Sequence, residues 1–218
     1  MIKIENIETY GWEAAIRGMR NPLNSWEKSD SRFDFYDCAA FSNTFGHVDV
    51  VIGENDHDLM MRLVKAGTEH RKFLRMVTVT MDITAPLYWW KEWDTYKVGT
   101  VANSCSTMHK LASRDLTIND FSTDNLMCDS YELLEGIIEH LNEYRRAFEE
   151  EGKKQNWWQL IQLLPSSYNQ KRTVQLNYEV LAAMCRQRAG HKLDEWREFI
   201  EVVRRELPYP ELFTGEVS

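Results

Sequence analysis

The sequence predicts an α+β protein that is mostly helical and has a small mixed or antiparallel sheet. The clearest strand signal is the alternation of apolar and polar residues from Val77 to Ile83, the period-two pattern of a strand with one buried face. Several other segments repeat apolar residues at steps of three and four, which indicates amphipathic helices. With 218 residues, 43% of them hydrophobic, the chain can bury a full core, and we expect a single domain spanning residues 1–218.

Composition narrows the classes of function. The net charge of −8 argues against a general nucleic-acid binder, because phosphate backbones attract basic surfaces. The four cysteines are widely spaced and the six histidines are scattered, so we expect no disulfide framework, no metal site and a reducing, cytoplasmic compartment. No apolar run approaches the roughly 20 residues that span a bilayer, so no membrane partner is expected.

The N-terminal part is predicted to hold an edge strand and a short helix. The strand covers the apolar run from Ile2 to Ile7, and one or two helical turns begin at Trp12. Residues 21–48 lack periodicity but are rich in aromatic side chains, which indicates an ordered loop and not a linker. These side chains are expected to be buried against this chain or a partner subunit.

The next segment is predicted to hold a helix, the strand described above and a second helix. Asn55 or Asp56 is the expected N-cap of the first helix, and Gly67 is expected just beyond its end. Pro86 suits the first turn of the second helix, where its missing N–H costs nothing. The tryptophans that follow from position 89 are expected to pack in the core, because aromatic side chains at helical spacing usually do.

The C-terminal half is predicted to be helical after a loop over residues 111–128. Asp129 or Ser130 is expected to cap a long amphipathic helix, and a short helix over residues 157–164 is stopped by Pro165. Two more helices with apolar residues at three and four residue steps follow, one ended by Gly190 and one closed by Pro208.

The loop from Thr95 to His109 is the part of the sequence that most favours a binding site. Gly99 would let its backbone approach a ligand closely. Its hydrogen-bonding side chains are Thr95, Tyr96, Lys97, Thr100, Asn103, Ser104, Ser106 and His109. They predict the wall of a polar-ligand site, although such residues also cap helices and form turns.

Two segments carry a resemblance to a known family. The run R-T-V-Q-L-N-Y-E-V-L-A-A-M-C-R-Q-R-A-G-H resembles the C-terminal segment of flavin-dependent thymidylate synthases, in which an Asn is followed eleven residues later by an Arg. Asn177 and Arg188 stand at that spacing. Upstream, residues 66–93 are similar to the family's strand and helix that precede its signature loop, with His70, Thr80 and Pro86 in matching places.

The signature loop departs from the family pattern. Family members carry Arg-His-Arg where this chain has Thr95, Tyr96 and Lys97, and Thr100 replaces a Ser. The change removes donors for flavin and phosphate, and each charge-assisted hydrogen bond is worth roughly 1.5 to 3 kcal/mol. Lys97 and several arginines, Arg172 among them, could restore positive charge, although a lysine is a point donor and not a planar fork.

The resemblance implies an enzyme of nucleotide metabolism that assembles as a homotetramer. It would methylate dUMP, or a related pyrimidine nucleotide, at C5, with methylenetetrahydrofolate as carbon donor, reduced FAD as hydride donor and NADPH as reductant. Arg188 would be catalytic, because the family's arginine at this position binds the pyrimidine ring and stabilises its developing negative charge. The implied cofactor-binding residues are His70, Tyr96, Lys97, Asn177 and His191. The implied substrate-binding residues are Asn103, Ser106, Arg172 and Arg188.

Structural alternatives stay open for these residues. Arg188 also suits the end of a helix as a charge favoured by the macrodipole, and Asn177 suits a helix first turn as a locally bonded residue. His70 suits a capping role, and His191 suits a surface position after a glycine. The alternative functions are a non-catalytic nucleotide-binding relative that has lost flavin chemistry, and a helical interaction protein without a small ligand.

Overall fold

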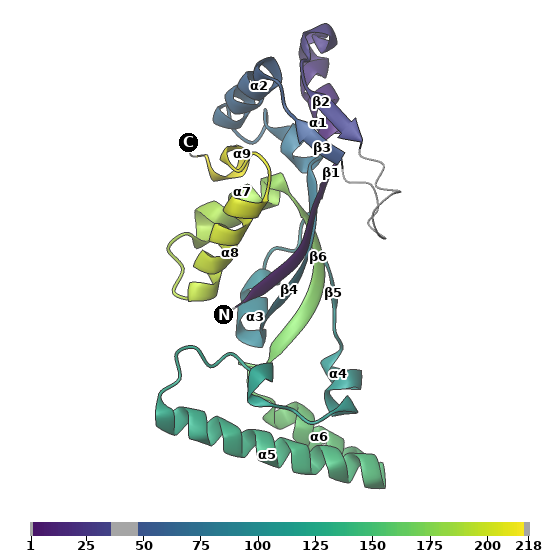
Figure 1. Cartoon of the computed structure of the whole chain (residues 1–218), viewed down its shortest axis with the longest axis vertical. Helices are drawn as coiled ribbons and strands as arrows, with labels where there is room; N and C mark the ends of the chain where they lie inside the picture. The colour runs from purple at the N-terminus through teal and green to yellow at the C-terminus, as the bar shows by residue number, and fades with distance from the viewer. Residues whose placement is uncertain (1, 36–47, 216–218) are drawn as a thin grey trace. The chain divides into compact units, whose positions relative to one another are not determined.

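The structure is a computed structural model that describes residues 2–35 and 48–215. The α+β class predicted from the sequence is confirmed (Figure 1). The strands are β1 (Lys3–Tyr10), β2 (Arg32–Phe35), β3 (Val48–Val51), β4 (Thr78–Pro86), β5 (Val101–Ser104) and β6 (Asn169–Asn177). The α-helices are α1 (Trp12–Arg20), α2 (Glu54–Lys65), α3 (Leu87–Trp93), α4 (Thr107–Lys110), α5 (Cys128–Glu151), α6 (Lys154–Leu163), α7 (Tyr178–Arg188), α8 (Asp194–Glu206) and α9 (Glu211–Thr214).

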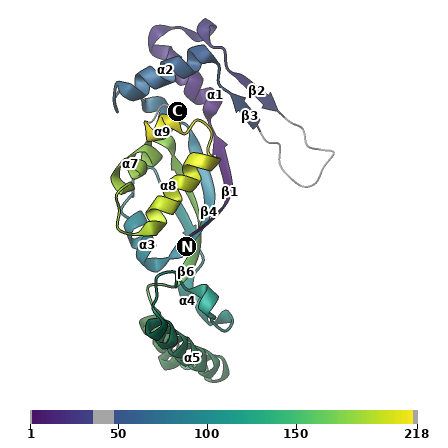
Figure 2. The same ribbon diagram turned by 60° about the vertical axis from the view of Figure 1, so that its left-hand side comes forward.

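Four of the strands form one sheet in the order β1-β4-β6-β5, so β1 is an edge strand, as expected. The other two strands, β2 and β3, pair antiparallel with Arg32 opposite Val51 and Phe35 opposite Val48 (Figure 2). The predicted loop over residues 21–48 therefore contains a strand, and its residues 36–47 lie outside the described part of the chain.

The chain divides into two compact units. The first unit comprises Met1–Asn6, Met81–Val174 and Lys192–Phe199, and the second comprises Ile7–Thr80, Gln175–His191 and Ile200–Ser218. The expected single domain over residues 1–218 stays a prediction.

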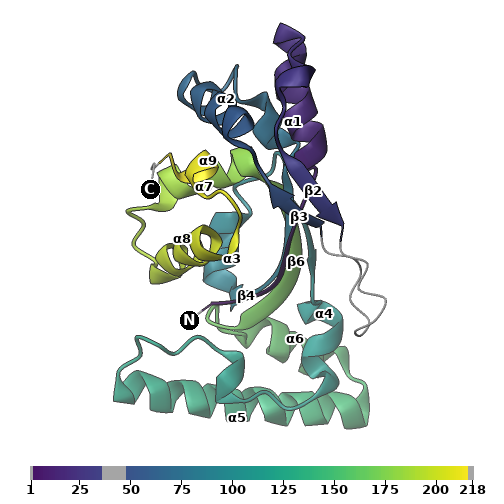
Figure 3. The same cartoon turned by 45° about the horizontal axis from the view of Figure 1, so that its top comes forward.

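The first unit has two apolar clusters. In one, Trp89, Trp93 and Trp196 pack with Phe199, and the rings of Trp93 and Trp196 are stacked 6.2 Å apart. The tryptophans of α3 are fully buried, which confirms their predicted core role. The other cluster lies where α5 runs beside α6 (Figure 3). It comprises Leu111, Leu116, Phe121, Leu134, Ile138, Leu141 and Leu160.

The second unit is built around α7, which packs on α9 and on the short 3-10 helix η3 (Lys72–Arg75). Tyr178, at the start of α7, is fully buried, and the rings of Trp12 and Phe213 pack edge-on against it at 5.1 and 5.0 Å. Its hydroxyl donates to the carbonyl oxygen of Pro208 at 2.6 Å, so the buried phenol is satisfied.

Helix α2 begins two or three residues earlier than predicted, because its cap comes from a distant segment. The N-cap is Gly53, and the N–H groups of Asn55 and Asp56 donate to the carboxylate of Asp30 at 3.0 and 3.1 Å. A Cβ at position 53 would lie 2.2 Å from the Asp30 carboxyl carbon, so the close approach of this carboxylate requires glycine. The expected capping role of Asn55 or Asp56 was wrong.

Strand β5 occupies a segment expected to be polar loop, and β6 occupies the polar entry to the helix ended by Gly190, so the prediction that Leu176 lies on that helix was wrong. All four residues of β5 are exposed, so this strand buries no side chain and leaves no apolar pattern in the sequence. In β6 only Val174 and Leu176 are buried apolar residues. Both strands are held by backbone hydrogen bonds, which any side chain permits.

The starts of α3 and α5 also differ from the predicted positions. Pro86 ends β4 and is the N-cap of α3, one position before the expected first turn. Helix α5 begins at Cys128, with Met127 as the N-cap, so neither Asp129 nor Ser130 caps it.

Candidate functional site

The residues implied as site residues fall into two groups, one in each unit. The second unit holds His70, Asn177, Arg188 and His191. The first unit holds Tyr96, Lys97, Asn103, Ser106 and Arg172.

Asn177 is the N-cap of α7. Its Oδ1 accepts a hydrogen bond from the backbone N–H of Val180 at 3.0 Å, which is the local bond weighed from the sequence. The cap uses the side-chain oxygen, whereas the amide nitrogen carries two N–H donors that a ligand can accept. Capping and ligand binding by Asn177 are therefore compatible.

An ion pair joins the segment before η3 to the first turn of α7. Arg71 Nη2 donates to Glu179 Oε1 at 3.0 Å, and Arg71 Nε lies 2.9 Å from Glu179 Oε2. The backbone N–H of Tyr178 also donates to the carbonyl oxygen of Val77 at 3.1 Å. Since Arg71 follows His70, these contacts hold the exposed His70 on a segment tied to the start of the helix that Asn177 caps.

Arg188 and His191 lie at the other end of α7. Arg188 is the last residue of the helix and is half-buried, and its carbonyl oxygen accepts from the backbone N–H of His191 at 3.0 Å. At 1.5 Å per residue, the eleven residues from Asn177 place Arg188 about 16 Å along the helix axis. A ligand that touches both ends must therefore be extended.

In the first unit, the turn after α3 carries Tyr96 and Lys97. The N–H of Tyr96 donates to the carbonyl oxygen of Trp93 at 2.9 Å, and the carbonyl oxygen of Tyr96 accepts from the Thr100 hydroxyl. The Tyr96 ring packs edge-on against Trp196. Lys97 is exposed, and Gly99 has a positive φ of 78°. The turn is thus anchored at Tyr96 and presents Lys97 to solvent.

Strand pairing brings the segment of Asn103 and Ser106 beside Arg172. The backbone N–H of Cys105 donates to the carbonyl oxygen of Lys171 at 2.9 Å, and the Gln170 amide donates back to that of Cys105 at 2.8 Å. Asn103 is exposed on β5, and Ser106 is half-buried just beyond it.

Arg172 is held by three groups of its own unit. Its guanidinium lies over the Trp90 ring at 4.2 Å, Nη1 donates to Asp94 at 2.8 Å, and Nε donates to Gln170 Oε1 at 3.0 Å. Its side chain is 15% exposed. The sequence did not predict which residues contact Arg172, and the structure shows that Asp94 matches its charge.

Comparison with solved structures decides the fold. Thymidylate synthase X from Helicobacter pylori, with FAD and dUMP, matches 99% of this chain and 98% of its own, with 16% identity and a TM-score of 0.70. A second structure of the flavin-dependent thymidylate synthase from this organism, also complexed with FAD and dUMP, matches 99% and 100% with 14% identity and a TM-score of 0.69. The chain has the flavin-dependent thymidylate synthase fold. Comparisons with protein-family models and with curated proteins found no match.

In this chain the thymidylate synthase fold carries a polar cluster that the sequence did not single out. Asp82 on β4 accepts from the Thr173 hydroxyl at 2.6 Å and from the Asn6 amide at 2.9 Å, and Lys171 Nζ lies 3.1 Å away. These contacts, the Thr173 bond foremost, hold the pKa of Asp82 below its usual value. The sequence does contain a signal for this cluster, because the alternating pattern places Asp82 on the polar face of β4.

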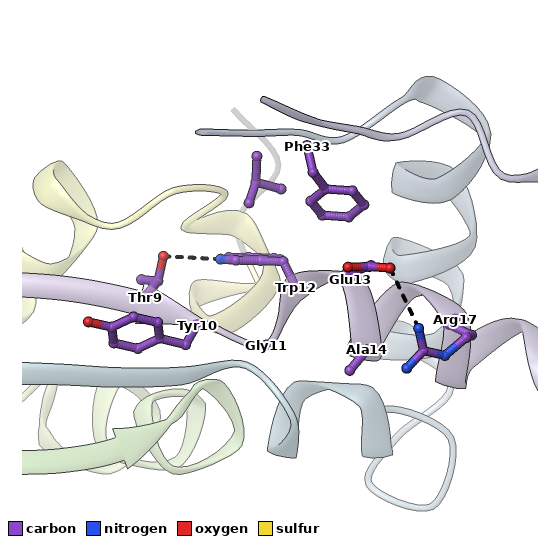
Figure 4. A pocket seen from close by; sticks show the side chains of 9 residues that line it. Thr9, Tyr10, Gly11, Trp12, Glu13, Ala14, Arg17 and Phe33 are labelled. Atoms are coloured by element: carbon purple, nitrogen blue, oxygen red, sulfur yellow. Dashed lines mark hydrogen bonds and ion pairs between the residues drawn. The ribbon is translucent and has the colours of Figure 1, made fainter. Parts of the chain in front are cut away.

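The thymidylate synthase fold here also has a surface pocket of about 290 Å³ in the second unit (Figure 4). It lies at the start of α1, where Trp12 donates to the Thr9 hydroxyl at 3.1 Å and Glu13 and Arg17 are 3.6 Å apart. Phe33 and Val50 complete the lining. None of the implied site residues lines this pocket, and its two charged groups, Glu13 and Arg17, pair with each other.

Within residues 2–35 and 48–215, no group of three His, Cys, Asp or Glu side chains is placed to hold a metal ion. In the same residues, no helix is long and apolar enough to cross a membrane.

Proposed function

We propose that this protein is a flavin-dependent enzyme that methylates dUMP, or a related pyrimidine nucleotide, at C5, with methylenetetrahydrofolate as carbon donor. The observation that supports this most is the tie between His70 and the Asn177-capped start of α7. His70 and Asn177 are 107 positions apart in the sequence, and the Arg71–Glu179 pair holds them on adjoining segments. The resemblance implies flavin contacts for both residues. Both Helicobacter pylori structures of this fold contain FAD and dUMP.

The residues present fit a flavin dinucleotide. The Asn177 amide N–H groups and the exposed His70 imidazole offer hydrogen bonds at one end of α7, and His191 follows the other end, where Arg188 lies about 16 Å away along the axis. An extended dinucleotide suits such a separation better than a mononucleotide does. When bound, reduced FAD supplies the hydride for the reaction, with NADPH as the reductant.

Arg188 is proposed as the catalytic residue. Its guanidinium would hold the pyrimidine ring and stabilise the negative charge that develops on the ring during the reaction. A fixed positive group in a site that excludes water needs little reorganisation as the charge forms, and such preorganised electrostatic stabilisation is usually a large catalytic effect. Asn103 and Ser106 would contact the nucleotide, and Tyr96 and Lys97 the cofactor.

We further propose a homotetramer with sites completed by neighbouring subunits. His70, Lys97 and Asn103 are all exposed on the single chain, whereas binding sites usually enclose most of the ligand surface. Light scattering across protein concentrations tests this directly. A monomer at micromolar concentration that still turns over dUMP would contradict the shared site.

One observation favours a second candidate function, a nucleotide-binding relative without flavin chemistry. Thr95, Tyr96 and Lys97 stand in place of Arg-His-Arg, and the charge of Arg172, which was expected to help restore positive charge, is matched by Asp94. The chain therefore offers fewer uncommitted cationic groups near this loop than the family pattern does.

An absorption spectrum of the purified, tag-free protein separates the two candidates. The enzyme is expected to retain stoichiometric FAD after desalting, to bleach with NADPH, and to regain colour with dUMP and methylenetetrahydrofolate while dTMP forms. Retained dUMP binding without FAD binding would select the second candidate. A protein that binds neither, as an intact oligomer, would support the interaction protein instead.

A further inference from the structure

A cavity of about 370 Å³ in the second unit lies apart from the residues proposed for thymidylate synthesis. It is bounded by α7, α8 and α9, with Arg71 and Val64 completing its wall. None of His70, Asn177, Arg188 and His191 lines it.

The spacing of residues on α7 explains this separation. Ala182, Cys185, Arg186 and Ala189 line the cavity and recur at steps of three and four, so they share one face of the helix. Arg188 is two positions from Arg186, about 200° around the helix axis, and therefore lies on a different face. One helix thus presents two arginines to two different surroundings.

The cavity gathers arginines in an acidic protein. Arg71, Arg186 and Arg204 line it, and no Asp or Glu is among its described lining residues. Arg71 is oriented by its two contacts with Glu179, and the side chains of this pair are 14% and 15% exposed. The whole chain has a net charge of −8, so this concentration of arginine is local.

The remaining wall adds a hydroxyl and apolar surface. Thr214 contributes the hydroxyl, and Leu212 and Phe213, both almost fully buried, contribute the apolar part. Arginine guanidinium groups bind phosphate oxygens through paired, charge-assisted hydrogen bonds. A volume of 370 Å³ lies at the small end of the range for small-molecule sites, about 300 to 1,000 Å³.

We propose that this cavity binds a small organic phosphate, with the phosphate among Arg71, Arg186 and Arg204 and an apolar or aromatic group against Phe213. The site is separate from the proposed nucleotide site and does not depend on flavin binding.

Calorimetric titration of the full-length protein at low salt with phenyl phosphate tests the proposal. We expect saturable binding with a stoichiometry of one per chain, weaker binding of inorganic phosphate, and none of phenol. The variants R186Q and R204Q are each expected to weaken phenyl phosphate binding at least tenfold, since each removes a charge-assisted contact.

The matched control is R205Q, which removes the neighbouring arginine of α8. Arg205 does not line the cavity and pairs with Glu206 at 2.7 Å. The affinity of R205Q for phenyl phosphate is expected to equal that of the unaltered protein. Circular dichroism establishes that each variant is folded. An equal loss of affinity in R205Q, or no loss in R186Q and R204Q, would overturn the assignment.

Competition separates this site from the proposed nucleotide site. Phenyl phosphate is expected to bind with unchanged affinity in the presence of saturating dUMP. Displacement by dUMP would place the probe in the nucleotide site and overturn the proposal. If dUMP does not bind at all, the proposed enzyme function fails, whereas the titrations of R186Q, R204Q and R205Q still decide the phosphate site.

Discussion

Arg71 and Glu179, separated by 108 positions in the sequence, form a two-point ion pair. Arg71 Nη2 donates to Oε1 at 3.0 Å, and Nε lies 2.9 Å from Oε2 as a second charge contact without a hydrogen bond. The pair fixes the segment that carries His70 to the first turn of α7. Stability, the proposed flavin contacts and the phosphate cavity therefore all depend on this contact.

Removing either partner is expected to cost about 2 kcal/mol of unfolding free energy, because a mostly buried charge loses its match. The variants R71M and E179L, and the double variant, form a double-mutant cycle measured by urea unfolding. We expect the double variant to lose less unfolding free energy than the sum of the losses in the two single variants. Strictly additive losses would show that the two groups are not coupled.

Arg188→Ala is expected to abolish dTMP formation while leaving the fold intact. Loss of a single group that stabilises transition-state charge lowers kcat by about 100-fold to 1,000-fold. The measurement is turnover of dUMP by the purified variant, with its unfolding curve compared with that of the unaltered protein. R197A is the control, because Arg197 is an exposed residue of α8 that pairs with Asp194. Retained turnover in R188A would rule out the proposed role.

Asp56 is expected to make stability depend on pH in acid. It is fully buried and accepts from Arg20 Nε at 2.6 Å and from the hydroxyls of Ser29 and Ser31, each at 2.7 Å. Burial raises the pKa of Asp56, but the hydrogen bonds from Ser31, Ser29 and Arg20 outweigh it and leave the pKa below its usual value. D56N is expected to lose about 3 to 5 kcal/mol at pH 7, because Arg20 would stay buried without its partner.

The lowered pKa of Asp56 in the folded state determines the direction in which stability changes with pH. The unfolded state, with a pKa of about 3.9, takes up the proton more readily, so the stabilisation is complete above that pH and is lost as pH falls through the folded pKa. The difference in unfolding free energy between the unaltered protein and D56N should stay constant from pH 8 to pH 5 and shrink below about pH 4. A constant difference down to pH 2 would contradict the lowered pKa.

Tyr88 is expected to make stability fall in alkali. Burial, and then its hydrogen bond to Glu195, raises the pKa of Tyr88 to about 12. The unfolded phenol titrates near pH 10, so the folded state keeps its proton longer, and stability present below about pH 10 is lost as pH rises toward 12. Unfolding free energies of the unaltered protein and Y88F, measured from pH 9 to 12, should converge as pH rises. Parallel curves would contradict the assignment.

How much of the fold could be predicted differs from element to element. The strand β4 and the helices α2, α3 and α5 to α8 were predicted because each buries one face, and burial leaves a periodic pattern in the sequence. Strand β5 was missed because all its side chains are exposed and its pairing uses backbone atoms alone. The start of α2 was misplaced because Asp30, 25 positions before Asn55, supplies the capping carboxylate.

The candidate site shows the same division. The sequence singled out Asn177 and Arg188 by their spacing, and it fixed their separation along one helix, because a helix advances by a constant rise per residue. It did not indicate that Arg172 would be matched by Asp94, nor that Arg71 would meet Glu179. Such pairs depend on how separate segments pack, which no local pattern records.

By itself, the sequence determined the α+β class, most of the helices, the buried tryptophans of α3 and the acidic overall charge, because each follows from residue type and short-range periodicity. The tertiary structure alone decided which charges meet, where Asp56 is buried, and that Arg71, Arg186 and Arg204 line one cavity. The physical reason is that these contacts join residues tens of positions apart. Their energies depend on distance and burial in the folded chain, and not on the order of residues along it.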